Sequence, residues 1–263
     1  MNILDKIVLD KRKEVDLKKS IIPVSQLEAS VLFQRPTVSL ANALRNSNSG
    51  IISEHKRRSP SKSVINQNNS VADVAVGYEK AGACGMSVLT DGKYFGGSLD
   101  DLLLARASVQ MPLLRKEFII DEYQLLEAKA HGADVILLIA AILTRAEIKT
   151  LSELAKQLHL DVLLEVHDEE ELHKSIMPSL DMLGVNNRNL KTFEVSLDTS
   201  KTLSKLIPDD FVKVSESGIS STEAIQELKP YGYKGFLIGE NFMKTDNPGL
   251  SALQFIKSIN QEP

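Results

Sequence analysis

The fold is decided by the stretch ADVILLIAAILTRAEIKTLSELAKQLHLDVLLEV, residues 133–166. Two short runs rich in Val, Ile and Leu, at 135–140 and 162–166, flank a segment at 146–158 in which apolar residues recur every three or four positions. Such runs are typical of buried parallel strands. The recurrence of apolar residues in the segment between the runs is typical of an amphipathic helix. The stretch therefore predicts one strand–helix–strand unit.

The same alternation extends from this unit toward both ends of the chain. We expect strands at 51–56, 86–90, 113–116, 135–140, 162–166, 182–186, 212–216 and 236–239. Helices are expected at 71–80, 99–107, 121–130, 146–158, 169–174, 199–206, 222–228 and 250–259. Eight such pairs in a chain of 263 residues fit the roughly 250 residues of a (β/α)8 barrel. We predict an α/β fold in which residues 49–263 form a single (β/α)8 TIM barrel.

The first 48 residues lie outside this alternation. Helical periodicity is present in ILDKIVLDKRKEV at 3–15 and in VSLANALRN at 38–46, with an irregular connection expected at 20–36. These residues predict an N-terminal helical extension, 1–48, that packs on the barrel.

Composition limits the possible functions. The chain is 43% hydrophobic and 25% charged, and its net charge of -4 gives no general attraction to nucleic acid or to an anionic membrane. Its one cysteine, Cys84, cannot form an internal disulfide, and no segment reads as a signal peptide or a membrane span. We expect a cytoplasmic protein with neither a nucleic-acid nor a membrane partner.

Polar side chains stand at the ends of five predicted strands. In barrel enzymes these carboxyl ends form the active site, so the side chains should converge on one mouth. A charged group at the end of a buried strand is costly unless it is paired or used, which favours a functional site over a structural ring of ion pairs. The residues are Glu54, Lys56, Lys116, Glu165, Asn186, Glu216 and Ser217.

Two glycine turns follow the last two predicted strands. They are SESGIS at 215–220, with Gly218, and IGEN at 238–241, with Gly239 and Glu240. Barrels commonly bind phosphate there through backbone amides and the start of a short helix, so the turns predict a phosphorylated small-molecule substrate. Arg188 and Lys62 could add positive charge. Ser59 could add a hydroxyl, although a helix-capping role fits it equally well.

Several segments together resemble the indole-3-glycerol-phosphate synthase family, across essentially the whole barrel. They are EHKRRSPSK at 54–62, SVLTDGKYFGGSLDDL at 87–102, PLLRKEFIIDEYQLLEA at 112–128, LLEVHDEEEL at 163–172, GVNNRNLKTFEV at 184–195 and SESGI at 215–219. The resemblance implies conversion of 1-(2-carboxyphenylamino)-1-deoxyribulose 5-phosphate to indole-3-glycerol phosphate, carbon dioxide and water in tryptophan biosynthesis, without a metal or an organic cofactor. Contact with other enzymes of that pathway is left open. The chain departs from the family pattern at His55, usually apolar, and at Ser63, usually glycine.

The resemblance also implies which residues act. The seven strand-end residues would carry the reaction or hold the substrate, with Lys116 as the proton donor and Glu165 and Glu54 as candidate bases. Lys56 would pair with the substrate carboxylate or act as a second acid. The residues expected to bind substrate are Ser59, Pro60, Phe95, Phe118, Arg188, Leu190, Gly218, Gly239 and Glu240. Among these, the apolar slot for the aromatic ring would be Pro60, Phe95, Phe118 and Leu190, for which loop packing is the alternative.

Two rival functions remain at this point. Phosphoribosylanthranilate isomerase shares the barrel and the type of ligand but relies on a cysteine and an aspartate, and Cys84 precedes its strand instead of following it. The other rival is a barrel that binds the sugar phosphate as a sensor or scaffold without turnover.

Two histidines lie close to the predicted site residues. Alternation along the first strand predicts that the His55 side chain faces the helices, neutral and hydrogen-bonded. His167 could orient residues at the mouth of the barrel.

Overall fold

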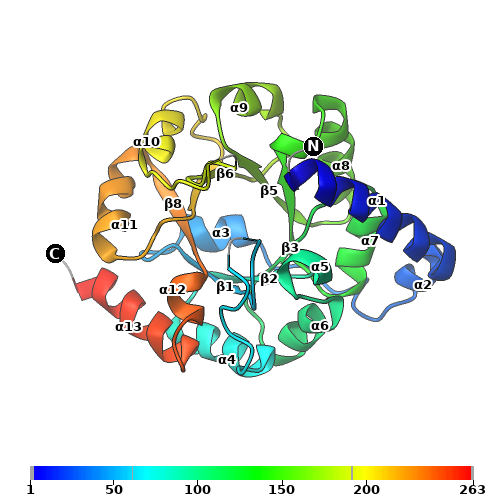
Figure 1. Cartoon of the computed structure of the whole chain (residues 1–263), viewed down its shortest axis with the longest axis horizontal. Coiled ribbons are helices and arrows are strands. Elements are labelled where there is room, and N and C mark those ends of the chain that lie inside the picture. The colour runs from blue at the N-terminus through cyan, green and yellow to red at the C-terminus, as the bar shows by residue number, and fades with distance from the viewer. Residues whose placement is uncertain (1–2, 61, 191, 262–263) are drawn as a thin grey trace.

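The computed structural model describes residues 3–60, 62–190 and 192–261. Eight parallel strands close into a barrel in chain order, inside a ring of helices (Figure 1). The strands are β1 (Ile51–His55), β2 (Gly85–Leu89), β3 (Leu113–Lys116), β4 (Val135–Ile139), β5 (Asp161–Val166), β6 (Met182–Asn186), β7 (Val212–Glu216) and β8 (Tyr233–Ile238). The TIM barrel is thus confirmed. The main difference is that β8 begins at Tyr233 and not at 236.

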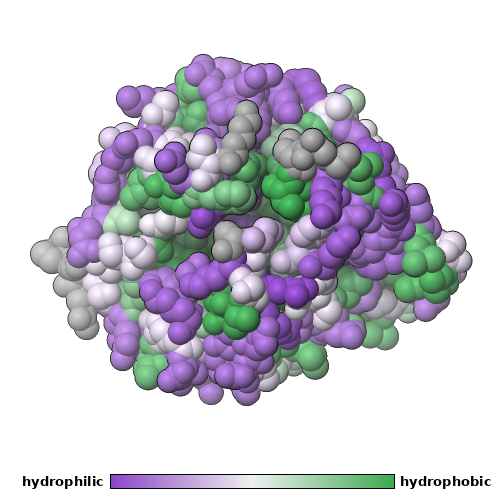
Figure 2. Space-filling view, in the orientation of Figure 1, coloured by the Kyte–Doolittle hydropathy of each residue, from purple (hydrophilic) through white to green (hydrophobic). Residues whose placement is uncertain are grey.

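Each strand is followed by a helix that covers the outside of the barrel. These helices are α4 (Val71–Ala81), α6 (Leu99–Ser108), α7 (Tyr123–Ala130), α8 (Arg145–Gln157), α9 (Glu169–Ser175), α10 (Asp198–Ser204), α11 (Thr222–Leu228) and α13 (Pro248–Gln261). Four short helices were not among the elements that the sequence predicted: α5 (Gly92–Phe95), η1 (Ala140–Ile142), η2 (Lys229–Tyr231) and α12 (Glu240–Met243). The outer surface seen in Figure 2 is mostly hydrophilic. Within the described part of the chain, no helix is long and apolar enough to cross a membrane.

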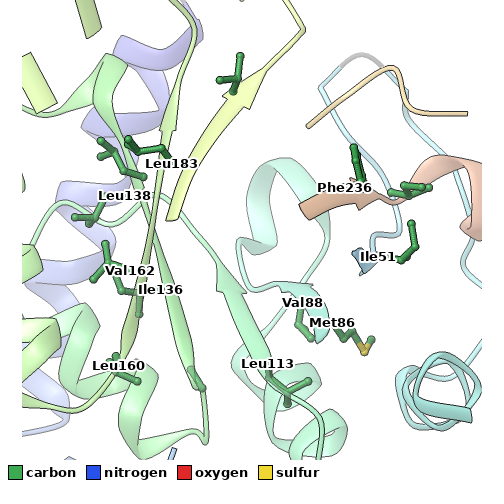
Figure 3. Close-up of a cluster of buried hydrophobic side chains, with 14 of the residues drawn as sticks. Ile51, Met86, Val88, Leu113, Ile136, Leu138, Leu160, Val162, Leu183 and Phe236 are labelled. Carbon is green, nitrogen blue, oxygen red and sulfur yellow. The ribbon is translucent and has the colours of Figure 1, made fainter. Parts of the chain in front are cut away.

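The two faces of the strands form two separate apolar layers. Residues such as Ile51, Leu113 and Phe236 pack outward against the helices, and Figure 3 labels these and other members of this layer. Alternate residues, such as Ile52 and Leu114, fill the barrel interior. Because side chains alternate along a strand, any residue two positions beyond an interior residue also points inward. This parity directs Glu54, Lys56, Lys116, Glu165, Asn186 and Glu216 into the mouth, whereas Ser217 lies in the turn after β7.

The N-terminal extension contacts the barrel at both ends. It consists of α1 (Ile3–Ile21), α2 (Val24–Glu28) and α3 (Leu40–Arg45). Ile7 of α1, with Leu40 and Leu44 of α3, belongs to the same apolar cluster as the barrel interior, and α2 lies beside α7 (Figure 1). The expected irregular connection at 20–36 is wrong in part, since it contains α2. The boundary between extension and barrel at residue 48 stays a prediction.

Candidate active site

A cavity of about 420 Å³ opens at the carboxyl end of the barrel. Figure 2 shows a hollow near the centre of this face. The structure brings together around it all sixteen residues expected to act in catalysis or to bind substrate: Glu54, Lys56, Ser59, Pro60, Phe95, Lys116, Phe118, Glu165, Asn186, Arg188, Leu190, Glu216, Ser217, Gly218, Gly239 and Glu240. Their proximity is therefore a structural fact, while their individual roles stay predictions.

Lys116 lies among three carboxylates at the floor of the cavity. Its ammonium nitrogen is 2.5 Å from Glu216 Oε2, 3.8 Å from Glu165 Oε2 and 3.9 Å from Glu54 Oε2. The four side chains come from β3, β7, β5 and β1, and each lies two positions beyond an apolar residue of the barrel interior. One proton donor is thus surrounded by three groups that could accept or share its proton.

Burial and neighbouring charges set the pKa values of this group. Burial alone would raise the pKa of Glu54, but Lys56 and Lys116 outweigh it and lower that pKa. Burial also opposes ionisation of Glu165, yet His167 and Lys116 hold its pKa well below the usual range. The pKa of Glu216 is raised, by burial first and by the other carboxylates, although Lys116 opposes this.

The pKa of Lys116 is itself raised, because the carboxylates outweigh its burial. Lys116 is therefore an ammonium group at neutral pH, with its proton available to an oxygen placed in the cavity.

Two further polar residues complete this end of the site. Lys56 Nζ lies 2.7 Å from Glu54 Oε1, so Glu54 has a cation on each side. Asn186 donates from Nδ2 to Glu165 Oε1 at 3.2 Å, while its Oδ1 accepts from the backbone amide of Arg188 at 3.0 Å. This fixes the Asn186 amide between the β5 carboxylate and the loop after β6.

The turns after β7 and β8 form a further part of the mouth, next to Glu216 and Glu54. Ser217 and Gly218 have positive φ angles of 67° and 79°, and Gly239 directly precedes the short helix α12. A Cβ at Gly239 would overlap the Glu54 carboxylate, so glycine is required there by contact. Glu240 Oε1 accepts from Lys62 Nζ at 2.6 Å, and Lys62 does not line the cavity. In this structure the positive charge expected from Lys62 is therefore paired with the Glu240 carboxylate.

An apolar wall faces these polar groups. The rings of Phe95 and Phe118 are 6.0 Å apart between centroids and inclined at 38°. Sequence reasoning missed a second part of this wall, which comes from α1 through the side chains of Ile3, Leu4 and Ile7.

Sequence reasoning also missed two buried acids beside this wall. Asp91 and Glu117 line the cavity, and both pair with Lys11 of α1. Lys11 Nζ lies 3.0 Å from Asp91 Oδ2 and 3.0 Å from Glu117 Oε1. These ion pairs attach α1 to the mouth of the barrel.

A signal for the missed wall is present in the sequence. The residues of α1 that are buried, Ile7, Lys11 and Val15, are spaced four apart, which marks one face of a helix. A lysine within that stripe indicates a buried anionic partner.

His55 and Ser63, the two departures from the family pattern, do not line the cavity. His55 is buried and does not line the cavity, but the hydrogen bond expected for it is absent at Nε2, which has no partner. Burial, followed by the charge of Arg57, lowers the pKa of His55 to about 4, so it is neutral as expected. Ser63, the other departure, does not have the positive φ that would strain a serine.

These features define a class of protein: a (β/α)8-barrel enzyme whose mouth combines acid–base side chains, an apolar wall and glycine turns suited to phosphate. No cluster of His, Cys, Asp and Glu able to hold a metal ion occurs among the residues that the structure describes. A family model described as indole-3-glycerol phosphate synthase matches residues 4–255. The chain belongs to the indole-3-glycerol phosphate synthase family, whose members are decarboxylating lyases of tryptophan biosynthesis.

Curated relatives agree over nearly their whole length. An indole-3-glycerol phosphate synthase from Bacteroides thetaiotaomicron is 48% identical over 258 residues, covering 98% of this chain and 99% of the relative. One from Albidiferax ferrireducens is 42% identical over 254 residues, covering 95% and 96%. Among solved structures, KGPDC from Streptococcus mutans matches with a TM-score of 0.61 at 12% identity, over 82% of this chain and 99% of that chain. The structural match supports the fold alone.

Proposed function

We propose that this chain closes the indole ring of 1-(2-carboxyphenylamino)-1-deoxyribulose 5-phosphate and releases indole-3-glycerol phosphate, carbon dioxide and water. The observation that carries the proposal is the position of the Lys116 ammonium among Glu54, Glu165 and Glu216, at the floor of a cavity with one apolar wall. An aromatic acid linked to a sugar phosphate needs acid–base groups, an apolar wall and a phosphate site together.

The first step makes a carbon–carbon bond. The ring carbon that bears the carboxylate attacks the sugar ketone, and negative charge develops on the ketone oxygen. Lys116 donates its proton to that oxygen, which becomes a hydroxyl. Carbon dioxide then leaves, and the electron pair of the broken bond restores the aromatic ring.

The second step removes water. The new hydroxyl leaves with a proton from an acid, while a base takes a proton from the neighbouring carbon. Glu54 and Glu165 fit the base because both are held ionised, and Lys56, 2.7 Å from Glu54 Oε1, fits the second acid or the partner of the substrate carboxylate. Asn186 would hydrogen-bond an intermediate. Glu216 would hold Lys116 in place through their 2.5 Å contact.

Substrate binding is assigned to the rest of the mouth. Backbone amides around Ser217, Gly218, Gly239 and Glu240 would hold the phosphate, with a hydroxyl from Ser59 and charge from Arg188. Pro60, Phe95, Phe118 and Leu190 would enclose the aromatic ring; all of these residues line the cavity.

The isomerase alternative lacks its cysteine at the mouth. Cys84 lies just before β2, its backbone amide bonds to Ile51 O at the start of β1, and it does not line the cavity. It packs instead against the interior cluster that contains Leu40.

The proposal is tested by turnover of the purified, chelator-treated protein with no cofactor added. When the carboxyphenylamino deoxyribulose phosphate is supplied, the indole product, followed by its fluorescence, and carbon dioxide should form in equal molar amounts. Binding without product would favour a sensor, and conversion of phosphoribosylanthranilate instead would favour the isomerase.

A further inference from the structure

His167 lies between two carboxylates at the edge of the site. Its Nε2 is 3.3 Å from Glu165 Oε1, without the alignment of a hydrogen bond, and its Nδ1 is 3.1 Å from Glu171 Oε2. The backbone amide of His167 also donates to Glu171 Oε2, at 2.8 Å. The imidazole is therefore fixed on one side by α9 and directed on the other side at a candidate base.

The first turn of α9 holds Glu171 in this position. Asp168 caps the helix, with Oδ1 accepting from the Glu171 backbone amide at 2.8 Å. The acidic run at 168–171 therefore does more than complement a helix amino terminus, because one of its carboxylates reaches back to His167.

The charges around His167 favour its protonated form. The charged groups that face it are Glu165 on β5 and Glu171 on α9, and the next one is Lys116 on β3, 3.8 Å from Glu165 Oε2. Burial alone would lower the pKa of His167, but the two carboxylates raise it to about 10. His167 is thus an imidazolium at neutral pH.

We propose that His167 is a positioning residue for Glu165: its charge, anchored by Glu171, keeps the Glu165 carboxylate ionised and turns Oε2 toward Lys116. The inference rests on the proposed function, since it concerns the state of one of its candidate bases. The two oxygens of Glu165 have different partners, with His167 and Asn186 at Oε1 and Lys116 at Oε2. Loss of the imidazolium should free the carboxylate to rotate and to bind a proton.

The test compares His167→Asn with the matched control His173→Asn. His173 lies on α9 in a similar pair, 3.2 Å from Glu169 Oε1, but its side chain is 60% exposed and does not line the cavity. The ratio of kcat/KM at about pH 5 to that at about pH 8 should fall roughly tenfold in His167→Asn relative to the parent, because Glu165 is then protonated more readily. KM should change little, and His173→Asn should follow the parent.

A second background separates positioning from a structural effect. In Glu165→Gln there is no carboxylate left to support, so adding His167→Asn should change kcat by less than about threefold, well within the hundredfold scale of acid–base assistance. An unchanged pH ratio in His167→Asn, or an equal loss of activity in both backgrounds, would overturn the proposal.

Nuclear magnetic resonance of labelled histidine provides a readout that needs no turnover. Glu165→Gln and Glu171→Gln should each lower the pH at which His167 loses its proton, by at least about one unit, and leave the His173 resonance in place. If neither variant moves the His167 titration, the proposal fails even where the enzyme is active. If the parent has no turnover, the proposed function fails, and the titration still decides whether His167 is held by the two carboxylates.

Discussion

Replacement of His55 by phenylalanine should make the protein less sensitive to acid. The imidazole is 1% exposed, its Nε2 has no partner, and its pKa is lowered to about 4 by burial first and by Arg57 second. An unfolded histidine has a pKa of about 6.5, so below that pH the unfolded chain takes up a proton that the folded chain does not bind until about pH 4. Stability therefore falls as the pH decreases through this window.

The magnitude follows from the two pKa values. The full difference is worth about 3 kcal/mol, and about 2 kcal/mol of it is lost between roughly pH 7 and pH 5. Because phenylalanine cannot bind a proton, His55→Phe should gain about 2 kcal/mol over the parent across that interval, whatever its offset at neutral pH.

Urea unfolding of the parent and of His55→Phe at the two pH values measures this gain directly, with turnover assayed on the same preparations. Turnover should stay near that of the parent because His55 does not line the cavity. Parallel pH dependence in the two proteins would refute the neutral buried state. A hundredfold loss of turnover with unchanged unfolding would place His55 in the active site.

Three other substitutions probe the site and its supports. Glu165→Gln should keep KM close to the parent value and lower kcat by about a hundredfold or more, because shape is kept and basicity is lost; unchanged kcat across the pH range removes Glu165 from the mechanism. Gly184→Ala places a Cβ 2.5 Å from Glu216 Oε1 and 3.2 Å from Leu163 Cδ1. It should lower the free energy of unfolding in urea by about 1 to 3 kcal/mol, and it should lower kcat by displacing Glu216. Parent values for the unfolding free energy and for kcat would contradict the contact. Lys11→Met leaves the buried carboxylates of Asp91 and Glu117 without their ammonium partner. It should lower the free energy of unfolding by about 3 to 5 kcal/mol. A decrease below about 1 kcal/mol in the same assay would show that these ion pairs are not needed for stability.

The fold could be predicted because each step of the chain repeats one pattern. The bounds of β3, β6 and β7 agree with the sequence prediction. In all three, buried apolar residues come first and a polar residue ends the strand. The start of β8 was missed because Lys234 and Gly235 interrupt the apolar run, and strand pairing with β1 and β7 overrides that local signal. Short helices such as α5 were missed because four residues carry no period.

The active site could be predicted from strand ends, because a barrel converts sequence position into a place at the mouth. The loop residues Ser59, Pro60, Phe95, Phe118, Arg188 and Leu190 were expected from the family resemblance instead. Residues that carried neither signal were not found. The wall from α1 comes from a helix outside the repeat, and its burial depends on the ion pairs of Lys11, a tertiary contact. The alignment of His167 with Glu165 and Glu171 likewise depends on how α9 turns back after β5.

We expect Lys116 to supply the proton for ring closure in this mouth. The most direct test is single-turnover conversion of the carboxyphenylamino deoxyribulose phosphate by the parent and by Lys116→Met, with substrate binding measured on the same samples. Methionine keeps most of the side-chain volume and removes the proton, so ring closure should slow by roughly two to four orders of magnitude while the variant still binds the substrate. Turnover within about threefold of the parent would contradict the assignment, because general acid assistance is worth at least about a hundredfold.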